Sequence, residues 1–259
     1  MSAVISLLTD FGIKDHYVGS MKGAVLQVCP DATIVDISHM VTPGAVAEGA
    51  FLLKCAYTHF PAGTVHLAVV DPGVGSHRHL IAVKTKDYWF VGPDNGLLAW
   101  AAELEGDYSV LRIDPKKAAI GSISSVFHGR DILGPAAARI ASGVPVDSFT
   151  EPLGAIVHLP ETSPVRVNGY LMGSIVHVDH FGNCITNIQK KDIAGLDIET
   201  VEVAGYRIDG YVTCYADAAG DQPVVLVGSS GHLEIAIRQE SAARAFNLSV
   251  GAGVRVCLK

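Results

Sequence analysis

Short apolar runs alternate with segments of helical spacing along the first 145 residues of the chain. Apolar, β-branched runs between turn residues predict strands, and apolar positions three and four residues apart predict helices. An alternation of strands and helices is typical of an α/β domain whose mostly parallel sheet is covered by helices on both faces. The pattern predicts strands at residues 3–8, 33–37, 65–70, 80–85, 88–92 and 108–113, and helices at 17–28, 45–56, 97–105 and 130–141.

The pattern changes after Pro145, where a loop-rich stretch leads into short β-like runs with few helical segments. We therefore expect an N-terminal α/β domain over residues 1–162 and a smaller, antiparallel, β-barrel-like domain over residues 163–259. The strands expected in the second domain span residues 174–178, 201–203, 206–208, 224–227, 233–237 and 254–258.

The charge of the chain argues against a polyanionic partner. The formal net charge is −7, and no Lys/Arg cluster is longer than the pair at residues 116–117. A basic face is what nucleic acids and anionic membrane surfaces require, so we expect the protein to bind neither. No apolar run approaches the roughly 18 residues of a membrane helix, and the N-terminus lacks the basic region of a signal peptide. These features predict a soluble, cytoplasmic protein.

The five cysteines are odd in number and widely spread, which favours free thiols over a disulfide framework or a zinc site. Two histidines, His77 and His79, flank Arg78 and could both face a metal ion, but no clustered set of carboxylate and histidine ligands completes such a site. We therefore expect no metal and no cofactor.

One strand end is of particular interest for chemistry. The run VHLAVV ends in Asp71, a Pro-Gly turn follows, and Arg78 comes seven residues after Asp71. In α/β proteins, ligands bind in the loops outside the carboxyl ends of the strands, so this carboxylate and guanidinium form a candidate site. A turn capped by an aspartate and followed by a solvated arginine is an equally good interpretation of this segment alone.

Four segments place Asp or Asn beside Gly at the ends of apolar runs: TDFG, DPGVG, PDNG and DHFGN. Each suits an ordinary turn, but together they suit a ligand with hydroxyl groups and positive charge. The chain has neither GxGxxG after its first strand nor a P-loop, and none of its serines lies in a GxSxG elbow. A dinucleotide ligand and serine-hydrolase chemistry are therefore unsupported.

Two further segments carry candidate groups. In FHGRD, His128 could act as a general base or be an ordinary loop histidine. In GSSGHLEIA, the turn could hold a carboxylate through its N–H groups and hydroxyls. Glu234 alternates with Leu233 and Ile235, so we expect its side chain to face solvent or an interface.

Taken together, the motifs closely resemble those of the S-adenosyl-L-methionine (SAM) hydroxide adenosyltransferases, a group formerly called DUF62 and related to the fluorinase and chlorinase. The resemblance spans both domains in order. It implies hydrolysis of SAM to adenosine and L-methionine, by attack of water or hydroxide on ribose C5′. The motifs are TDFGxxDxYVGxMKG (9–23), VDISH (35–39), VVDPGVGSxR (69–78), GPDNG (92–96), FHGRD (127–131), FGNxxTNI (181–188) and GSSGxLEIA (228–236).

The resemblance also implies roles for individual residues. Family members carry an Asp, Arg, His trio beside the attacking water, and the matching residues are Asp71, Arg78 and His128. The substrate-binding positions that match are Asp10 for the ribose hydroxyls, Asp179 for the methionine ammonium, Asn183 for adenine and Ser229 for the methionine carboxylate, with Glu234 in the same motif as Ser229 and without a defined role.

The chain departs from the halogenases at several positions. They have Tyr and Thr where this chain has Asp71 and Val74, they have Arg where it has Ser230, and their acidic residue lies one position further from the FGN motif than Asp179. A carboxylate repels halide, so water is the expected nucleophile. The relatives are trimers, which implies a homotrimer with sites at the subunit interfaces. The alternatives are a SAM-dependent halogenase, a metal-dependent hydrolase and a protein that binds adenosine or SAM without turnover.

Overall fold

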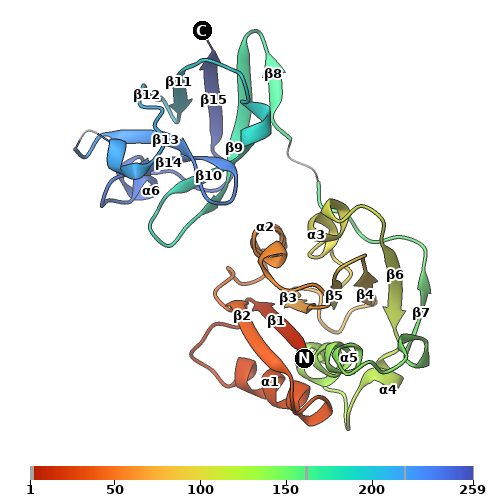
Figure 1. Ribbon diagram of the computed structural model, residues 1–259. Helices are drawn as coiled ribbons and strands as arrows, with labels where there is room; N and C mark the ends of the chain where they lie inside the picture. The colour runs from red at the N-terminus through yellow and green to blue at the C-terminus, as the bar shows by residue number, and fades with distance from the viewer. Residues whose placement is uncertain (1–2, 161–162, 219, 259) are drawn as a thin grey trace. The chain divides into compact units, whose positions relative to one another are not determined.

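The computed structural model describes residues 3–160, 163–218 and 220–258 (Figure 1). The chain divides into two compact units, Met1–Leu159 and Pro160–Lys259, which we call the α/β domain and the β domain. The boundary expected after residue 162 lies at residues 161–162, which are outside the described residues.

In the described part of the α/β domain, seven strands form one sheet in the order β2-β1-β3-β5-β4-β6-β7 (Figure 1). The ladders from β2 to β5 are parallel, and those from β5 through β4 and β6 to β7 are antiparallel, so the sheet is mixed. The strands are β1 (Val4–Thr9), β2 (Thr33–Ser38), β3 (Val65–Val69), β4 (Leu80–Lys84), β5 (Trp89–Pro93), β6 (Ser109–Ile113) and β7 (Thr150–Leu153).

Side chains along β3 alternate between two hydrophobic cores, one on each face of the sheet. Leu67 and Val69 pack with α1 (Tyr17–Val28) and α5 (Gly134–Ala141), whereas Ala68 packs with the other core. The second core includes buried residues of α2 (Val46–Ala56) and α3 (Ala99–Leu104). Helices therefore cover both faces, and the expected α/β class is confirmed. The short helical segments are Tyr57–His59, α4 (Pro115–Ala118) and Val146–Ser148.

The segment expected as one helix over residues 130–141 begins differently. Gly129–Leu133 forms a π-helical turn that runs directly into α5. Pro135 has no N–H to donate to a carbonyl four residues earlier, which is consistent with the wider turn before it. Such a turn displaces the residues before it relative to a regular helix, and His128 is the N-cap residue of this turn.

In the described part of the β domain, all strand ladders are antiparallel, in the order β12-β11-β15-β9-β10-β14-β13, with β8 on β9. Val225 of β13 donates from its N–H to the oxygen of Gly210 at 2.7 Å and accepts from Val212 at 2.9 Å. These bonds join the chain after β12 to β13 and nearly close the barrel. The strands are β8 (Val165–Val167), β9 (Tyr170–Val178), β10 (Cys184–Gln189), β11 (Ile198–Val203), β12 (Tyr206–Ile208), β13 (Pro223–Val227), β14 (His232–Ile237) and β15 (Gly253–Leu258), and short helices span Lys190–Asp192, Tyr215–Asp217 and Ala242–Ala245 (α6).

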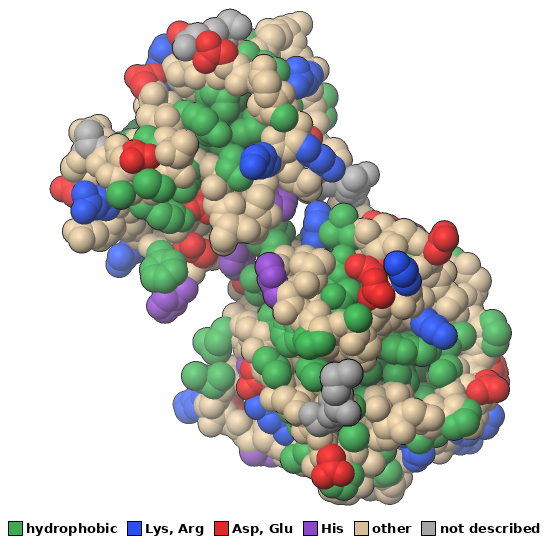
Figure 2. Space-filling model, in the orientation of Figure 1, with side chains coloured by type: hydrophobic (Ala, Val, Ile, Leu, Met, Phe, Trp, Pro, Cys, Tyr) green, Lys and Arg blue, Asp and Glu red, His purple; other side chains and the backbone are tan. Residues whose placement is uncertain are grey.

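On the face shown in Figure 2, acidic and basic side chains are scattered over each domain and form no basic patch. Within the described residues, no helix is both long and apolar enough to cross a bilayer.

Candidate active site

Parallel pairing brings three polar turns to one edge of the α/β sheet. The TDFG turn starts at the last residue of β1, His39 follows β2, and Asp71 comes two residues after β3. Strands β1, β2 and β3 are parallel neighbours, so their carboxyl ends share an edge. This edge is where the fold class places a ligand.

At this edge, Arg78 joins Asp71 to His128. The Arg78 Nε donates to Asp71 Oδ1 at 2.6 Å, and its Nη2 donates to Asp71 Oδ2. The same Nη2 lies 3.1 Å from His128 Nδ1. The side chains of Asp71 and Arg78 are only 6% and 9% exposed, so their pairing is shielded from solvent. The structure thus brings together the three side chains that the sequence analysis assigned to catalysis.

The contact with Arg78 also fixes the proton on His128. A guanidinium can only donate, so Nδ1 must accept and Nε2 carries the proton of the neutral ring. Burial, together with the neighbouring Arg78, lowers the pKa of His128 below its usual 6.5, although Asp71 and Asp131 oppose the shift. The imidazole is therefore neutral at neutral pH, with its basic nitrogen facing the guanidinium.

The loop before His128 is anchored by Asp131, a residue of the FHGRD motif to which the sequence analysis gave no role. Asp131 is buried, and its Oδ2 accepts from the N–H of Ser124 at 2.8 Å. Arg130 donates from Nε to Asp131 Oδ1 at 2.6 Å and lies over the ring of Phe127. Because the carboxylate holds both ends of the segment 124–130, it fixes the position of His128 within it.

Glycines allow the neighbouring loops to approach this segment. Gly75 has φ of +81°, and a Cβ there would lie 2.8 Å from the oxygen of Ser125. A Cβ on Gly129 would lie 3.2 Å from the ring of Phe11. Larger residues would push the Asp71 loop, the TDFG turn and the His128 segment apart.

Asp10 lies in the TDFG turn at the same edge. Its Oδ2 accepts a hydrogen bond from the N–H of Gly44 at 2.8 Å. Within the part of the chain that the structure describes, its Oδ1 has no hydrogen-bond partner. The half-buried carboxylate therefore has one oxygen available for a donor such as a ribose hydroxyl.

In the β domain, Asp179 and Asn183 close the turn between β9 and β10. Asp179 Oδ1 accepts from the N–H groups of Phe181 and Asn183 at 2.9 and 2.8 Å, and its Oδ2 accepts from Asn183 Nδ2 at 3.0 Å. Gly182 makes the tight turn possible, since φ is +87° and a Cβ would meet Ser241 at 2.0 Å from Oγ. The two predicted binding residues are therefore in direct contact.

Glu234 corrects one expectation. It was expected to face solvent or an interface, yet it is only 4% exposed and accepts a hydrogen bond from the hydroxyl of Tyr215. Strand β14 is an inner strand between β10 and β13, and the side chain lies against Gly228 and Tyr215. Alternation along the sequence predicts one open face, but both faces of β14 are covered.

A neighbouring carboxylate affects Glu234 in this part of the β domain. Burial, and to a lesser extent the charge of Asp179, raises the pKa of Glu234 against the opposing hydrogen bond from Tyr215. Across the described ranges, neither Asp179 nor Glu234 has a lysine or arginine partner. Ser229 lies exposed in the turn between β13 and β14, next to Gly228.

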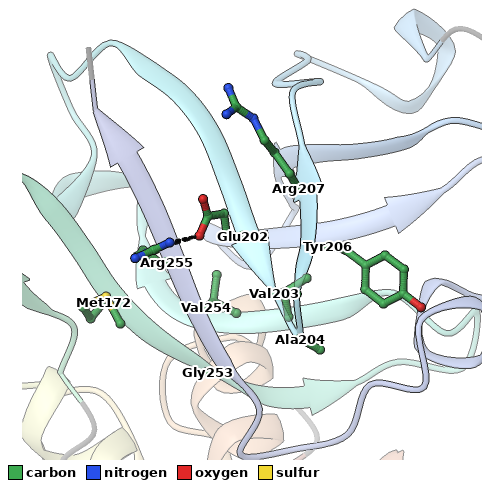
Figure 3. Close-up of a pocket in the computed structure, with 10 residues that line it drawn as sticks. Met172, Glu202, Val203, Ala204, Tyr206, Arg207, Gly253, Val254 and Arg255 are labelled. Atoms are coloured by element: carbon green, nitrogen blue, oxygen red, sulfur yellow. Dashed lines mark hydrogen bonds and ion pairs between the residues drawn. The ribbon is translucent and has the colours of Figure 1, made fainter.

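A hollow of about 430 Å³ on the β domain contains none of the predicted site residues (Figure 3). It lies over β11 and β15, where Arg255 pairs with Glu202 and stacks on Tyr170. In the region covered by the structure, no three His, Cys, Asp or Glu side chains lie close enough together to hold a metal ion, His77 and His79 included.

Comparison with known families agrees with the division of the chain into two domains. Residues 5–150 match the SAM hydroxide adenosyltransferase N-terminal domain, and residues 173–255 match the C-terminal domain of the same family. The chain belongs to the SAM hydroxide adenosyltransferase family. The resemblance inferred from the motifs is thereby confirmed.

Relatives of this SAM hydroxide adenosyltransferase family member match it over nearly its whole length. An (R)-S-adenosyl-L-methionine hydrolase of Methanocaldococcus jannaschii is 35% identical, covering 95% of this chain and 92% of its own. A protein of the same name from Thermus thermophilus is 33% identical, covering 97% of this chain and 98% of its own. A fluorinase of an Actinoplanes species is 29% identical, covering 98% of this chain and 97% of its own.

The fold is also found among solved structures. The crystal structure of an uncharacterised conserved protein from Thermotoga maritima superposes with a TM-score of 0.92 at 34% identity. The match covers 98% of this chain and 99% of that one.

Proposed function

We propose that this protein is an enzyme that hydrolyses SAM to adenosine and L-methionine. The observation that carries the proposal is the trio of Asp71, Arg78 and His128 at the edge of the α/β sheet where ligands bind in this fold class, with the Asp71–Arg78 pair shielded from solvent. The full-length similarity to proteins named (R)-S-adenosyl-L-methionine hydrolase supports the same substrate and reaction.

Hydrolysis at ribose C5′ requires the protein to position and deprotonate a water molecule, but not to activate the leaving group. Methionine leaves from a sulfonium as a neutral thioether, so the leaving group needs neither a proton nor a Lewis acid. The enzyme has to hold water in line with the C5′–S bond and take up its proton. Positioning of this kind is worth ~7 kcal/mol or more in effective molarity. SAM is the substrate, and the proposal includes no cofactor.

Within the trio, Asp71 is the group that takes the proton from water. The basic nitrogen of His128 accepts from Arg78, so its Nε2–H can only donate to a neighbouring oxygen. The carboxylate oxygens of Asp71 have further lone pairs beyond those that Arg78 uses. Arg78 then has two roles: it orients the carboxylate and stabilises negative charge that develops on the attacking oxygen.

The same carboxylate favours water over halide as the nucleophile. A halide ion at the position of the water would be repelled by Asp71 and would have no hydroxyl donor at Val74. We therefore assign hydrolysis rather than halogenation, although fluorinases are among the relatives.

Substrate binding draws on both domains. Asp10 receives the ribose hydroxyls on its free Oδ1, and Asn183 contacts adenine. Asp179 and Glu234, which have no cationic partner in the described structure, attract the ammonium group of the methionine part. The exposed Ser229 and the turn around it bind the methionine carboxylate.

The proposal includes a homotrimer in which neighbouring copies complete each site, and a cytoplasmic location. All five cysteines are free, as is usual for a protein of a reducing compartment. Sedimentation equilibrium tests the trimer, and a monomer with full activity would refute it. Cell fractionation tests the location.

A product assay tests the function. Purified protein is incubated with SAM of R and of S configuration at sulfur, and adenosine and methionine are resolved by chromatography. We expect both products in equal amounts. Their absence at stoichiometric enzyme would refute hydrolysis, and retained SAM binding in that case would identify a binding protein. Formation of a halogenated nucleoside when chloride or fluoride is added would indicate a halogenase instead. Loss of activity with a chelator would indicate a metal-dependent enzyme.

A further inference from the structure

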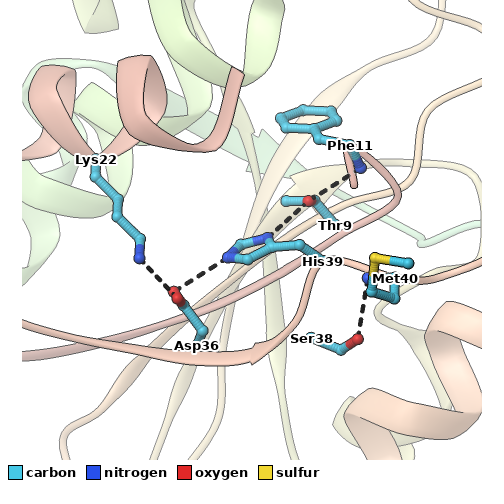
Figure 4. A network of polar contacts seen from close by, with 7 residues as sticks. All are labelled: Thr9, Phe11, Lys22, Asp36, Ser38, His39 and Met40. Carbon is cyan, nitrogen blue, oxygen red and sulfur yellow. Dashed lines mark hydrogen bonds and ion pairs between the residues drawn. The ribbon is translucent and has the colours of Figure 1, made fainter. Parts of the chain in front are cut away.

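Side chains of four residues form a line of polar contacts behind the turn that carries Asp10 (Figure 4). Lys22 of α1 donates from Nζ to Asp36 Oδ2 at 2.6 Å. Asp36 Oδ1 lies 3.1 Å from His39 Nε2, an ion-pair distance without the alignment of a hydrogen bond. His39 Nδ1 lies 2.8 Å from Thr9 Oγ1. The line ends at the residue immediately before Asp10.

The partners of His39 determine where its protons lie. A lone pair on Nε2 would face the carboxylate of Asp36, so Nε2 carries the proton and Nδ1 accepts from the hydroxyl of Thr9. The same Thr9 oxygen accepts from the N–H of Phe11 at 3.2 Å, and the backbone oxygen of His39 accepts from the N–H of Gly12 at 2.7 Å. His39 therefore holds the TDFG turn on both sides of Asp10.

The hydroxyl of Thr9, the imidazole of His39 and the carboxylate of Asp36 follow the order of a catalytic triad, but the burial of Thr9 argues against a nucleophilic role. Its side chain has no exposed surface. Its oxygen already accepts from the backbone of the turn, so the hydroxyl cannot reach a substrate. The contacts of Thr9 and His39 can therefore only hold the backbone of the TDFG turn in place.

We infer that His39 is a positioning residue for substrate recognition, which sets the orientation of the Asp10 carboxylate through Thr9 and the TDFG turn. The inference rests on the proposed function, in which Asp10 binds the ribose hydroxyls. The hydrogen bond that Asp10 accepts from the N–H of Gly44 holds one of its oxygens, and the turn sets where the other oxygen points. Asp36 and Lys22 are partly exposed and serve to keep the proton on Nε2.

The chain contains a matched control in a second pair of hydroxyl and imidazole. Ser6 Oγ, also on β1, lies 2.6 Å from His66 Nδ1, and both residues are buried. The ring of His66 stacks on Phe90 at 5.2 Å between centroids, and the other rings it contacts are those of Tyr57, Phe60 and Tyr88, which lie outside the loops of the site. Replacing His66 removes the same type of contact from the same strand without releasing the TDFG turn.

The experiment measures how strongly the protein distinguishes adenosine from 2′,3′-dideoxyadenosine by isothermal titration calorimetry. The wild type is expected to bind adenosine about tenfold or more tightly, because a hydroxyl bonded to a carboxylate is lost in the analogue. His39→Ala and His39→Gln are expected to bring this ratio close to one. His39→Asn keeps an acceptor at the position of Nδ1 and is expected to keep the ratio within about twofold.

The ratio of the affinities for adenosine and 2′,3′-dideoxyadenosine distinguishes a loss of positioning from a loss of protein stability. His66→Leu is expected to lower the melting temperature and leave the ratio unchanged. A His39→Ala protein that keeps the full ratio, or a His66→Leu protein that loses it equally, overturns the inference. If His39→Ala does not fold, Thr9→Val, which has nearly the same shape without the hydroxyl, takes its place with the same expected loss.

The proposed function and the inference fail in different ways. A wild type that neither binds adenosine nor forms it from SAM refutes the proposed function, and the inference with it. A wild type that hydrolyses SAM and prefers adenosine, beside a His39→Ala variant with the same preference, refutes the inference alone.

Discussion

The α/β domain and the β domain both present carboxylates, but only the α/β domain supplies a cation to balance the charge at its candidate site. Arg78 holds both oxygens of Asp71 and contacts His128. In the β domain, the charge of Asp179 contributes to the raised pKa of Glu234, and no lysine or arginine in the described structure pairs with either. A carboxylate bound to a guanidinium is already compensated, whereas two uncompensated carboxylates attract an ammonium group. On this difference rests our proposal that the reaction takes place at the first site and that the second site binds the ligand.

The largest effect is expected from Asp71→Asn, which tests the first half of this comparison. The amide keeps the shape of the side chain but cannot take a proton from water. We expect kcat to fall about 10³-fold, while the dissociation constant for SAM changes little. Rapid-quench measurement of adenosine formation, together with calorimetry, checks both. An unchanged kcat with weakened binding would place Asp71 among the binding residues.

The proposed binding role of the β-domain carboxylates is tested by the variants Asp179→Asn and Glu234→Gln. Each removes a negative charge near the expected ammonium group, so the KM for SAM is expected to rise about tenfold to a hundredfold with a small change in kcat. Adenosine, which has no ammonium group, serves as the control ligand and should bind as before. Equal losses for SAM and adenosine would show that these carboxylates only support the fold.

Acid is expected to inactivate the enzyme through the α/β domain. The pKa of His128 is lowered, so the ring is neutral above about pH 6.5 and protonates only at lower pH. Protonated Nδ1 can no longer accept from Arg78. We expect kcat/KM to be constant above this range and to fall about tenfold per pH unit below the pKa.

The His128→Asn variant separates this titration from others. Its amide oxygen accepts from Arg78 but does not titrate, so the acid limb of the pH profile is expected to move to lower pH. An unchanged profile would mean that another group causes the loss.

The smallest effect is expected from Tyr215→Phe. The Tyr215 hydroxyl opposes the rise in the pKa of Glu234, so its removal lets that pKa rise further. Glu234 then protonates at a higher pH, and SAM affinity near pH 5 is expected to drop about threefold, with no change at pH 8. Calorimetry at the two pH values checks this, and an equal loss at both would indicate a packing defect.

Periodicity predicted the α/β domain well because its elements are regular. The helix expected over residues 17–28 is α1, and the antiparallel pair expected near residues 80–92 is formed by β4 and β5. Strand β10 was not predicted because Thr186 and Asn187 interrupt its apolar pattern. The Thr186 hydroxyl donates to the oxygen of Leu233 at 2.7 Å, and Asn187 Oδ1 accepts from the N–H of Ser174 at 2.8 Å. Polar side chains satisfied across strands resemble loop residues in a sequence.

The candidate site was predictable where a motif holds both partners and less so where the fold brings them together. Asp71 and Arg78 share one motif, and their ion pair matches the resemblance. His39 was part of a quoted motif without a role, because Thr9 is 30 residues away and meets it only through the parallel pairing of β1 and β2. Glu234 was misjudged because alternation along one strand does not reveal what covers its outer face.

The close contact between Gly228 and Glu234 has a consequence for how relatives of this chain can vary. A Cβ at position 228 would lie 2.0 Å from Glu234 Oε2, so a larger residue there requires the Glu234 carboxylate to move. Substitution of the glycine first expels the carboxylate, whereas substitution of the glutamate first leaves room for a side chain. The two positions are therefore expected to covary, with loss of the acidic group preceding any change in the turn above it.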